Sequence, residues 1–129
     1  MKQYFQKNNL SLLIYKGKKI IFASREKRIK PLFHCIKEKS IQGCSAIDKI
    51  VGEAAALLFI YAKIKQVHAV TISKGALVLL QKNKIKVTYD NLVDNILNED
   101  KTDLCPMEKL AKKIKDPEKF FEELKKVIK

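Results

Sequence analysis

The segment Ser45–Ala62, with the sequence SAIDKIVGEAAALLFIYA, is the most continuously apolar part of the chain. Its apolar residues recur at helical spacing along one side, and alanines together with Phe59 and Ile60 make the opposite side apolar as well. A helix that is apolar nearly all round belongs in the protein interior. The pattern predicts a single buried helix over Ser45–Ala62, around which the remaining elements pack.

The polar residues at the start of this predicted helix are candidates for a binding or catalytic site. Ser45 and Asp48 have the spacing of a capping box, so Asp48 is either a capping residue or a catalytic acid. Lys49 places a cation at the positive end of the helix dipole, which is unfavourable unless it faces an anion or pairs with Glu53. Gly52 weakens a helix by roughly 1 kcal/mol relative to alanine, which indicates close helix–sheet packing or close approach of a ligand. We therefore predict a bound phosphate or carboxylate beside Lys49 and the free helix amides.

Two short apolar runs, Leu10–Tyr15 and Lys19–Ser24, lie near the N-terminus and are separated by the turn sequence KGK. This pattern predicts two antiparallel strands joined as a hairpin. From Arg28 onward the apolar residues shift to helical spacing, and Pro31 is compatible with a first helical turn. The first helix of the chain is therefore expected to begin just after Arg28.

Strands and helices alternate in the middle of the chain. Ile41–Cys44 is predicted as a very short strand, and Val67–Ser73 as a central strand because it is β-branched and nearly all apolar. Ser73 is expected to cap a helix over Lys74–Gln81, and Ile85–Tyr89 to form a further strand. Strand–helix–strand connections within one sheet are crossovers. The order therefore predicts an α/β fold with a largely parallel sheet, helices on both faces and the antiparallel hairpin at one side.

The C-terminal part of the chain is predicted to be mostly helical. Asp90–Leu97 is expected to form a short helix and Asn98–Asp103 a polar loop. Pro106 suits the first position of the next helix, which makes Cys105 its cap and Glu108 the capping-box partner. A thiol at the positive end of a helix dipole is either reactive or a buried structural cysteine.

The tail, Pro117–Lys129, carries an apolar stripe at helical spacing among lysines and glutamates. Its apolar residues are Phe120, Phe121, Leu124, Val127 and Ile128. We expect a docking or dimer-forming helix here.

Composition narrows the class of protein. The chain has 129 residues, of which 47% are hydrophobic, and no linker divides it. We expect one domain over residues 1–129, with the helices from about residue 105 onward packing on it. The longest apolar run, Ala54–Ala62, is far shorter than the roughly 20 residues that span a bilayer, and the first residues lack the apolar centre of a signal peptide. Three cysteines without a CxxC motif indicate neither a disulfide framework nor a zinc ribbon. We therefore expect a cytoplasmic protein with reduced thiols and no membrane partner.

The formal net charge of +13 lies mostly in residues 1–42. A basic field attracts nucleic acids and small anionic molecules alike. All basic residues except Arg25 and Arg28 are lysines, the chain has no tryptophan, and no aromatic and basic RNA-binding motif is present. A lysine-rich solvated surface therefore explains the charge better than a nucleic-acid partner does, and nucleic-acid binding stays open as an alternative.

Ligands of parallel sheets bind at the carboxyl ends of strands, next to the amino ends of helices. The residues at predicted junctions of that kind are Ser24, Arg25, Arg28, Cys44, Ser45, Asp48, Lys49 and Ser73. We expect a small anionic or nucleotide-like ligand, held by Lys49 and the helix amides. The other ligand-binding candidates are Arg28, Cys44, Ser45, Gly52 and Ser73. Asp48 or Glu108 would exchange protons, and Cys44 or Cys105 would be the nucleophile.

Four segments in order, IKPLFHCI, IDKIVGEAAALLFIYA, VTISKGALVLL and CPMEKL, resemble domain-of-unknown-function family 1893 across almost the whole chain. The resemblance implies a cytidine-deaminase-like fold, a three-layer α/β/α sandwich. It also implies that a set of residues occupies the family's motif positions: Asp48, Lys49, Gly52, Cys105, Pro106 and Glu108.

The chemistry of zinc deaminases does not follow from this resemblance. Those enzymes present a His or Cys two residues before a Glu at one helix start and a Pro-Cys-x-x-Cys at the next. The first helix here begins with RIKPL and the predicted second one with CSAID, so at most one thiolate lies near the expected metal position. We expect no zinc-dependent deamination, no metal and no cofactor. Two alternatives to a small-molecule site remain: a non-catalytic interaction or homo-oligomerisation domain, and a basic nucleic-acid-associated module.

Overall fold

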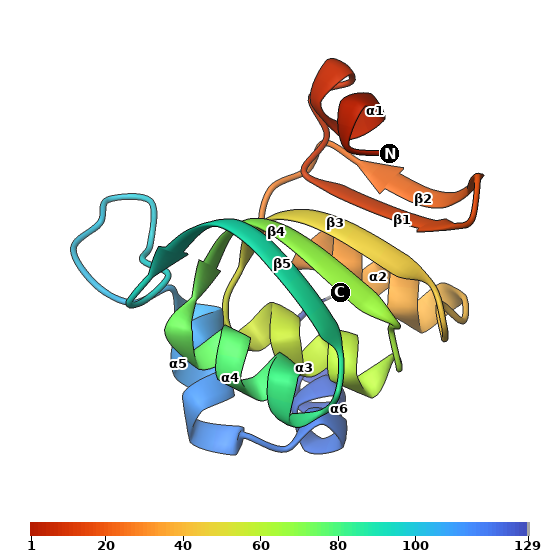
Figure 1. Ribbon diagram of the computed structural model, residues 1–129. Coiled ribbons are helices and arrows are strands. Elements are labelled where there is room, and N and C mark those ends of the chain that lie inside the picture. Colours follow the sequence, from red (N-terminus) through yellow and green to blue (C-terminus); the bar gives the residue numbers. More distant parts are fainter. Residues whose placement is uncertain (129) are drawn as a thin grey trace.

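The computed structural model describes residues 1–128 and shows an α/β protein with a five-stranded mixed sheet (Figure 1). Its helices are α1 (Lys2–Lys7), α2 (Lys30–Glu38), α3 (Glu53–Tyr61), α4 (Lys74–Lys82), α5 (Pro106–Ile114) and α6 (Pro117–Val127). Its strands are β1 (Leu12–Lys16), β2 (Lys19–Ser24), β3 (Ser45–Val51), β4 (Gln66–Ser73) and β5 (Lys86–Val93). Within this described part of the chain, no helix is long and apolar enough to span a membrane.

The strands follow the order β2-β1-β3-β4-β5 across the sheet. β1 is antiparallel to both β2 and β3, and this confirms the predicted N-terminal hairpin. β3, β4 and β5 are parallel, as the alternation of strands and helices predicts. The parallel half of the sheet therefore brings the carboxyl ends of three strands to one edge.

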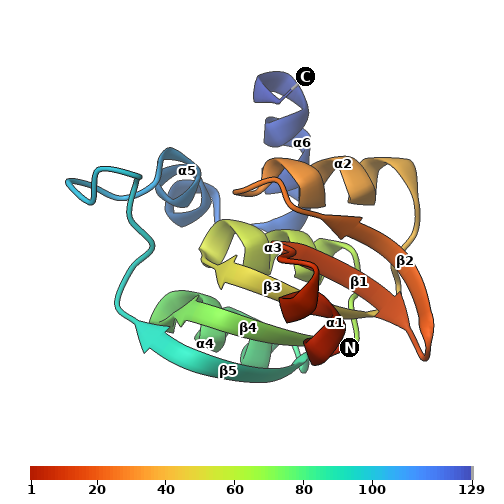
Figure 2. The same ribbon diagram turned by 90° about the horizontal axis from the view of Figure 1, so that it is seen from above.

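Helices α2 to α6 gather on one face of the sheet, and the short α1 lies on the other face over β1 and β3 (Figures 1 and 2). The main core lies beneath the helical layer and contains the fully buried Phe33, Phe59 and Phe120. A second, smaller cluster lies under α1 and consists of Phe5, Leu10, Leu13 and Ile47. The face of the sheet opposite the main core is thus covered at its β1–β3 end.

The predicted helix over Ser45–Ala62 is wrong in its first part. Residues Ser45–Val51 form the central strand β3, and the helix begins only at Glu53, after the extended residue Gly52. Both faces of β3 carry buried apolar residues: Ala46 and Val51 belong to the main core and Ile47 to the cluster under α1. A buried strand of this kind cannot be told from a buried helix by periodicity alone. The predicted capping role of Ser45 is therefore also wrong. Ser45 Oγ instead accepts a hydrogen bond from Gln66 Nε2 at 2.8 Å.

Two further sequence-based elements are corrected by tertiary pairing. Ile41–Cys44 is not a strand but a turn, closed by the Cys44 N–H donating to the Ile41 carbonyl at 3.0 Å. Asp90–Leu97 is not a helix, because β5 continues along β4 as far as Val93 and the chain then forms a loop. In contrast, the predicted cap of α4 is confirmed, since Ser73 Oγ accepts from the Ala76 N–H at 3.2 Å.

The apolar stripe of the tail is used inside the fold. Phe120, Phe121 and Leu124 on α6 are buried, and the rings of Tyr61 and Phe121 stack with centroids 4.3 Å apart. α6 therefore docks on α3 of its own chain and completes the main core.

Candidate functional site

A cavity of about 890 Å³ opens at the carboxyl edge of the parallel strands. It lies between the ends of β3, β4 and β5 and the first residues of α2, α3 and α5, and the loop between β5 and α5 forms a further wall. Its charged lining residues are Lys27, Arg28, Asp48, Lys49, Glu99, Lys101 and Glu108. Most of the remaining lining is apolar. This is the edge at which parallel α/β sheets bind their ligands.

The fold brings six of the predicted site residues together at this cavity and separates the others. Arg28, Asp48, Lys49, Gly52, Cys105 and Glu108 all line it. Cys44 and Ser45 lie at the amino end of β3, roughly 20 Å from its carboxyl end at about 3.3 Å per residue. Ser73 is buried at the start of α4, where it serves as the helix cap. Cys44 and Ser45 fit the site only if a helix begins at Ser45, and Ser73 fits it only if every strand end lines the cavity.

Asp48 reaches the cavity from the middle of β3, on the face that carries the main core. Burial raises the pKa of its carboxyl from 3.8 to about 8, although the backbone amides of Ile50 and Lys49 act in the opposite direction. At neutral pH the side chain is therefore mostly protonated, and it offers both a hydroxyl donor and a carbonyl acceptor. A carboxyl group in this state can act as a general acid.

Lys49 follows Asp48 on the same strand, and neighbouring strand residues point to opposite faces. Its side chain therefore leaves the strand on the side opposite to that of Asp48, although both residues line the cavity. Its backbone N–H donates to the Ser11 carbonyl at 2.9 Å, as part of the sheet edge. The prediction that Lys49 lies in the first turn of a helix, beside free amides, is wrong because β3 occupies that position.

The amides at the start of α3 are held by Glu108. Its carboxylate, only 4% exposed, accepts hydrogen bonds from the Glu53 N–H at 2.7 Å and from the Ala54 N–H at 2.8 Å. Burial raises the pKa of Glu108, and these two bonds act in the opposite direction. The positive end of α3 is therefore already paired with an internal carboxylate. The predicted capping-box role of Glu108 in its own helix, α5, is wrong, because its side chain reaches across to α3.

Gly52 makes this contact possible. A Cβ atom at this position would lie 2.3 Å from Glu108 Oε1, which is far inside van der Waals contact. The prediction of a close approach at Gly52 is therefore confirmed, and the approaching group is a carboxylate of the same chain.

Arg28 lies between a thiol and a carboxylate at the cavity wall. One guanidinium nitrogen, Nη1, donates to Cys105 Sγ at 3.4 Å, and the other, Nη2, lies 3.4 Å from Glu99 Oε1. Arg28 has a positive φ of 73°, so the backbone turns sharply just before α2. Cys105 is buried and is the cap residue of α5, but it makes no side-chain capping bond. The arrangement places a planar cation beside the thiol at the start of α5.

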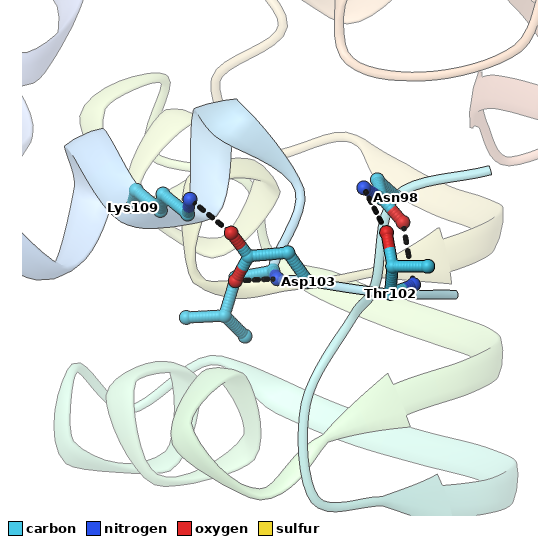
Figure 3. Close-up of polar contacts among 5 residues, drawn as sticks. Asn98, Thr102, Asp103 and Lys109 are labelled. Carbon is cyan, nitrogen blue, oxygen red and sulfur yellow. Dashed lines mark hydrogen bonds and ion pairs between the residues drawn. The ribbon is translucent and has the colours of Figure 1, made fainter. Parts of the chain in front are cut away.

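The outer wall of the cavity is the loop between β5 and α5. Figure 3 shows how this loop is held: Asn98 bonds to the backbone N–H and side chain of Thr102, and Asp103 joins the Leu104 N–H to Lys109 on α5. The sequence pattern does not indicate the cavity-lining residues of this loop, because part of the loop has the pattern of a helix. These residues are Asn95, Asn98, Glu99 and Lys101. A long irregular connection after a strand is itself a signal of function. In this chain, the signal becomes visible only when the end of β5 is known.

The raised pKa of Asp48 predicts how stability depends on pH. The folded protein retains a proton on Asp48 over the range from about 4 to about 8, in which the unfolded chain has lost it. The free energy of unfolding should therefore fall as the pH rises through this range and level off above it. Asp48→Asn, which stays neutral, should flatten this part of the slope, whereas Asp100→Asn in the exposed loop should retain it. Urea unfolding followed by circular dichroism at several pH values measures the slopes; equal slopes for wild type and Asp48→Asn would contradict the prediction.

Comparison with known proteins places the chain in a family. Residues 1–128 match the model of a domain of unknown function, DUF1893. A solved structure of a DUF1893 family protein from Thermotoga maritima is similar with a TM-score of 0.91 and 33% sequence identity, over 98% of this chain and 86% of that one. No curated protein matches the chain. The match along nearly the whole length shows that this protein belongs to the DUF1893 family.

Proposed function

We propose that the cavity binds a small molecule with an anionic group at one end and a hydrogen-bonding, partly apolar group at the other, as in a nucleotide. The observation that carries the proposal is that Arg28 and a protonated Asp48 line the same largely apolar cavity. Ligand sites in proteins combine an apolar lining with a few convergent polar groups in this way.

The anionic end would lie against Arg28. A guanidinium group binds phosphate and carboxylate oxygens with two parallel hydrogen bonds, and Lys27 and Lys101 add positive charge to the same cavity. Glu99 now faces Arg28, but its side chain is 79% exposed and such a surface ion pair contributes little stability. An incoming anion can therefore displace Glu99 at small cost.

The other end of the ligand would lie against the sheet. Asp48 supplies a hydroxyl donor and a carbonyl acceptor, and Thr71 lies on the neighbouring strand β4. Apolar contacts come from Ile50, Val93 and Met107, which suit a flat ring such as a nucleobase. The same geometry supports Asp48 as a proton donor and Cys105 as a nucleophile, should the bound molecule react. Glu108 is less suited to proton transfer, since its oxygens hold α3.

The proposal includes a cytidine-deaminase-like fold without deaminase chemistry. Its support is the observed order of hairpin, helix, strand, helix, strand, helix, strand. We propose no reaction that passes through zinc, because the sequence lacks the paired motifs that would hold it. The three free cysteines agree with a reducing, cytoplasmic setting.

Isothermal titration calorimetry with AMP, GMP, CMP and UMP tests this proposal, with inorganic phosphate as a further probe. We expect at least one nucleotide to bind the wild type, and Arg28→Ala to weaken that binding about tenfold or more, since a bidentate charge-assisted contact is lost. Asp48→Asn should weaken binding of nucleotides but not of phosphate. Lys18→Ala, in the exposed hairpin turn, is the matched control.

Lys49→Ala distinguishes the two assignments of the anion site. If Arg28 anchors the anion, Lys49→Ala should bind nearly as the wild type does, because the bidentate contact of the guanidinium group stays intact when one of several lysines at the cavity is removed. Loss of binding in Lys49→Ala with retention in Arg28→Ala would move the anion to the Lys49 side. A wild-type protein that binds none of these nucleotides would overturn the proposal.

A further inference from the structure

Strand β5 forms one edge of the sheet, and no other element of residues 1–128 lies beyond it (Figure 2). An edge strand presents a row of unpaired backbone N–H and C=O groups and is a ready template for pairing with another chain. Natural edges are protected by proline, bulges, charged side chains, short length or a covering segment. β5 covers the eight residues Lys86–Val93, contains no proline and pairs with β4 along its length.

The opposite edge of the sheet is better protected. There, Lys39 from the end of α2 donates its Nζ to the carbonyl of Ile21 at 3.4 Å, which satisfies an outward backbone acceptor of β2. Along β5, large apolar side chains are exposed instead: Tyr89 is 42% exposed and Leu92 is 41% exposed. The two edges therefore differ, and β5 has the features of an interface.

The direction of the free backbone groups of β5 follows from its first residue. The Lys86 N–H donates inward, to the Lys65 carbonyl at the start of β4, at 3.4 Å. Backbone groups alternate in direction along a strand, so those of Val87, Tyr89 and Asn91 point outward, away from the sheet. These outward residues would form the hydrogen-bonded pairs with any added strand.

Two side chains of β5 contact a histidine on the neighbouring strand, and these contacts show which face of the sheet they occupy. His68 on β4 contacts Thr88 Oγ1 through Nδ1 at 2.6 Å and Asp90 Oδ1 through Nε2 at 3.4 Å. Lys86, Thr88 and Asp90 therefore lie in a row on one face, alternating with Val87 and Tyr89 on the other.

We propose that β5 is the interface through which two copies of this chain form a twofold dimer, with their two sheets joined by antiparallel β5 strands. The occupant is a second copy because β5 is self-complementary. When Thr88 lies opposite Thr88 of the partner subunit, Lys86 of each copy lies opposite the partner's Asp90, and Val87 lies opposite the partner's Tyr89. Shifting the register by two residues in either direction removes the pairing of Lys86 with Asp90. Opposite charges and apolar pairs directly across an antiparallel ladder each favour association.

Charge exchange tests this interface. We expect the wild type to sediment as a dimer of 14.8 kDa chains at high concentration and to dissociate on dilution. Lys86→Glu and Asp90→Lys each place like charges opposite one another twice, so each should weaken self-association about tenfold or more. The double variant Lys86→Glu with Asp90→Lys should restore it. Rescue of this kind would not follow from a folding defect, and circular dichroism of each variant confirms that the chain is folded.

Cross-linking tests the register. Thr88 and Thr88 of the partner subunit would form a non-hydrogen-bonded pair. In such a pair the two Cα atoms lie about 4.5 Å apart, and a disulfide fits between them. Thr88→Cys should therefore form a disulfide-linked dimer under mild oxidation, whereas Val78→Cys, 61% exposed on α4, should not. The three native cysteines are buried and give little background. A wild type that is monomeric at every concentration, a dimer unaffected by Lys86→Glu, or a Thr88→Cys variant that does not cross-link would each overturn the proposal.

Discussion

Replacing Glu108 with alanine is expected to lower the free energy of unfolding by roughly 2–5 kcal/mol, because two buried amides of α3 would lose their charged acceptor. Glu108 accepts from the Glu53 and Ala54 N–H groups at 2.7 and 2.8 Å and is almost fully buried. The carboxylate therefore links α5 to the start of the most buried helix of the fold.

Chemical denaturation monitored by circular dichroism measures this loss. Glu108→Gln retains one acceptor oxygen and should cost less than Glu108→Ala. Glu122→Ala, an exposed change on α6 with only a surface partner in Lys125, is the control and should stay within about 0.5 kcal/mol of the wild type. If Glu108→Ala were as stable as Glu122→Ala, the hydrogen bonds between Glu108 and α3 would contribute nothing to the free energy of unfolding.

Replacing Gly52 with alanine should cost nearly as much, although it adds a single methyl group. The backbone of Gly52 is extended, with φ of −99°, so alanine meets no conformational strain there. Its Cβ would instead lie 2.3 Å from Glu108 Oε1 and 2.4 Å from Glu108 Cδ, and the carboxylate would have to leave. We expect a loss of about 3 kcal/mol from overpacking and from the broken hydrogen bonds.

A double-mutant cycle shows whether the two residues act on each other. In a Gly52→Ala background, Glu108→Ala should cost much less than it does in the wild type, because the same contact is already disrupted. Gly17→Ala is a useful comparison, since its added Cβ meets no atom within 4 Å and only its positive φ of 61° opposes the change. Strictly additive losses for Gly52→Ala and Glu108→Ala would contradict the contact.

The pairing of the α3 amides with the Glu108 carboxylate also limits where a ligand anion can bind in the cavity. A helix start whose first amides already bind Glu108 is not available to a ligand anion. The cation that we propose for the ligand anion is therefore the guanidinium of Arg28, just before α2, whose carboxylate partner Glu99 is 79% exposed. This moves the expected anion site from Lys49, where the sequence pattern placed it, to the wall near Cys105.

Several elements could be predicted because local pattern and tertiary context agree. The hairpin is marked by two short apolar runs around a glycine turn, and the helices α2, α4 and α6 each have an apolar stripe on one side only. α4 also has a capping serine, Ser73, at the expected position. In these segments the solvent-exposed face is polar, and that contrast sets the period.

Where both faces are buried, the contrast disappears. Residues 45–47 at the start of β3 are buried between α1 and the main helical layer, so nothing in these residues distinguishes a strand from a helical turn. β5 extends beyond its predicted end at Tyr89 for a related reason: residues 91–93 have little intrinsic strand pattern, and they pair with β4.

The sequence by itself determined which residue types can form a site: its motif positions include Asp48, Gly52, Cys105 and Glu108, and Arg28 lies at a predicted strand–helix junction. Only the tertiary structure decided what each of them does. Burial at the carboxyl edge of the sheet protonates Asp48, and the approach of α5 to α3 turns Glu108 from a local cap into a distant one. Crossover connections bring these residues together from segments far apart in the chain. A side chain's charge state and partners depend on that surrounding space, which local spacing does not encode.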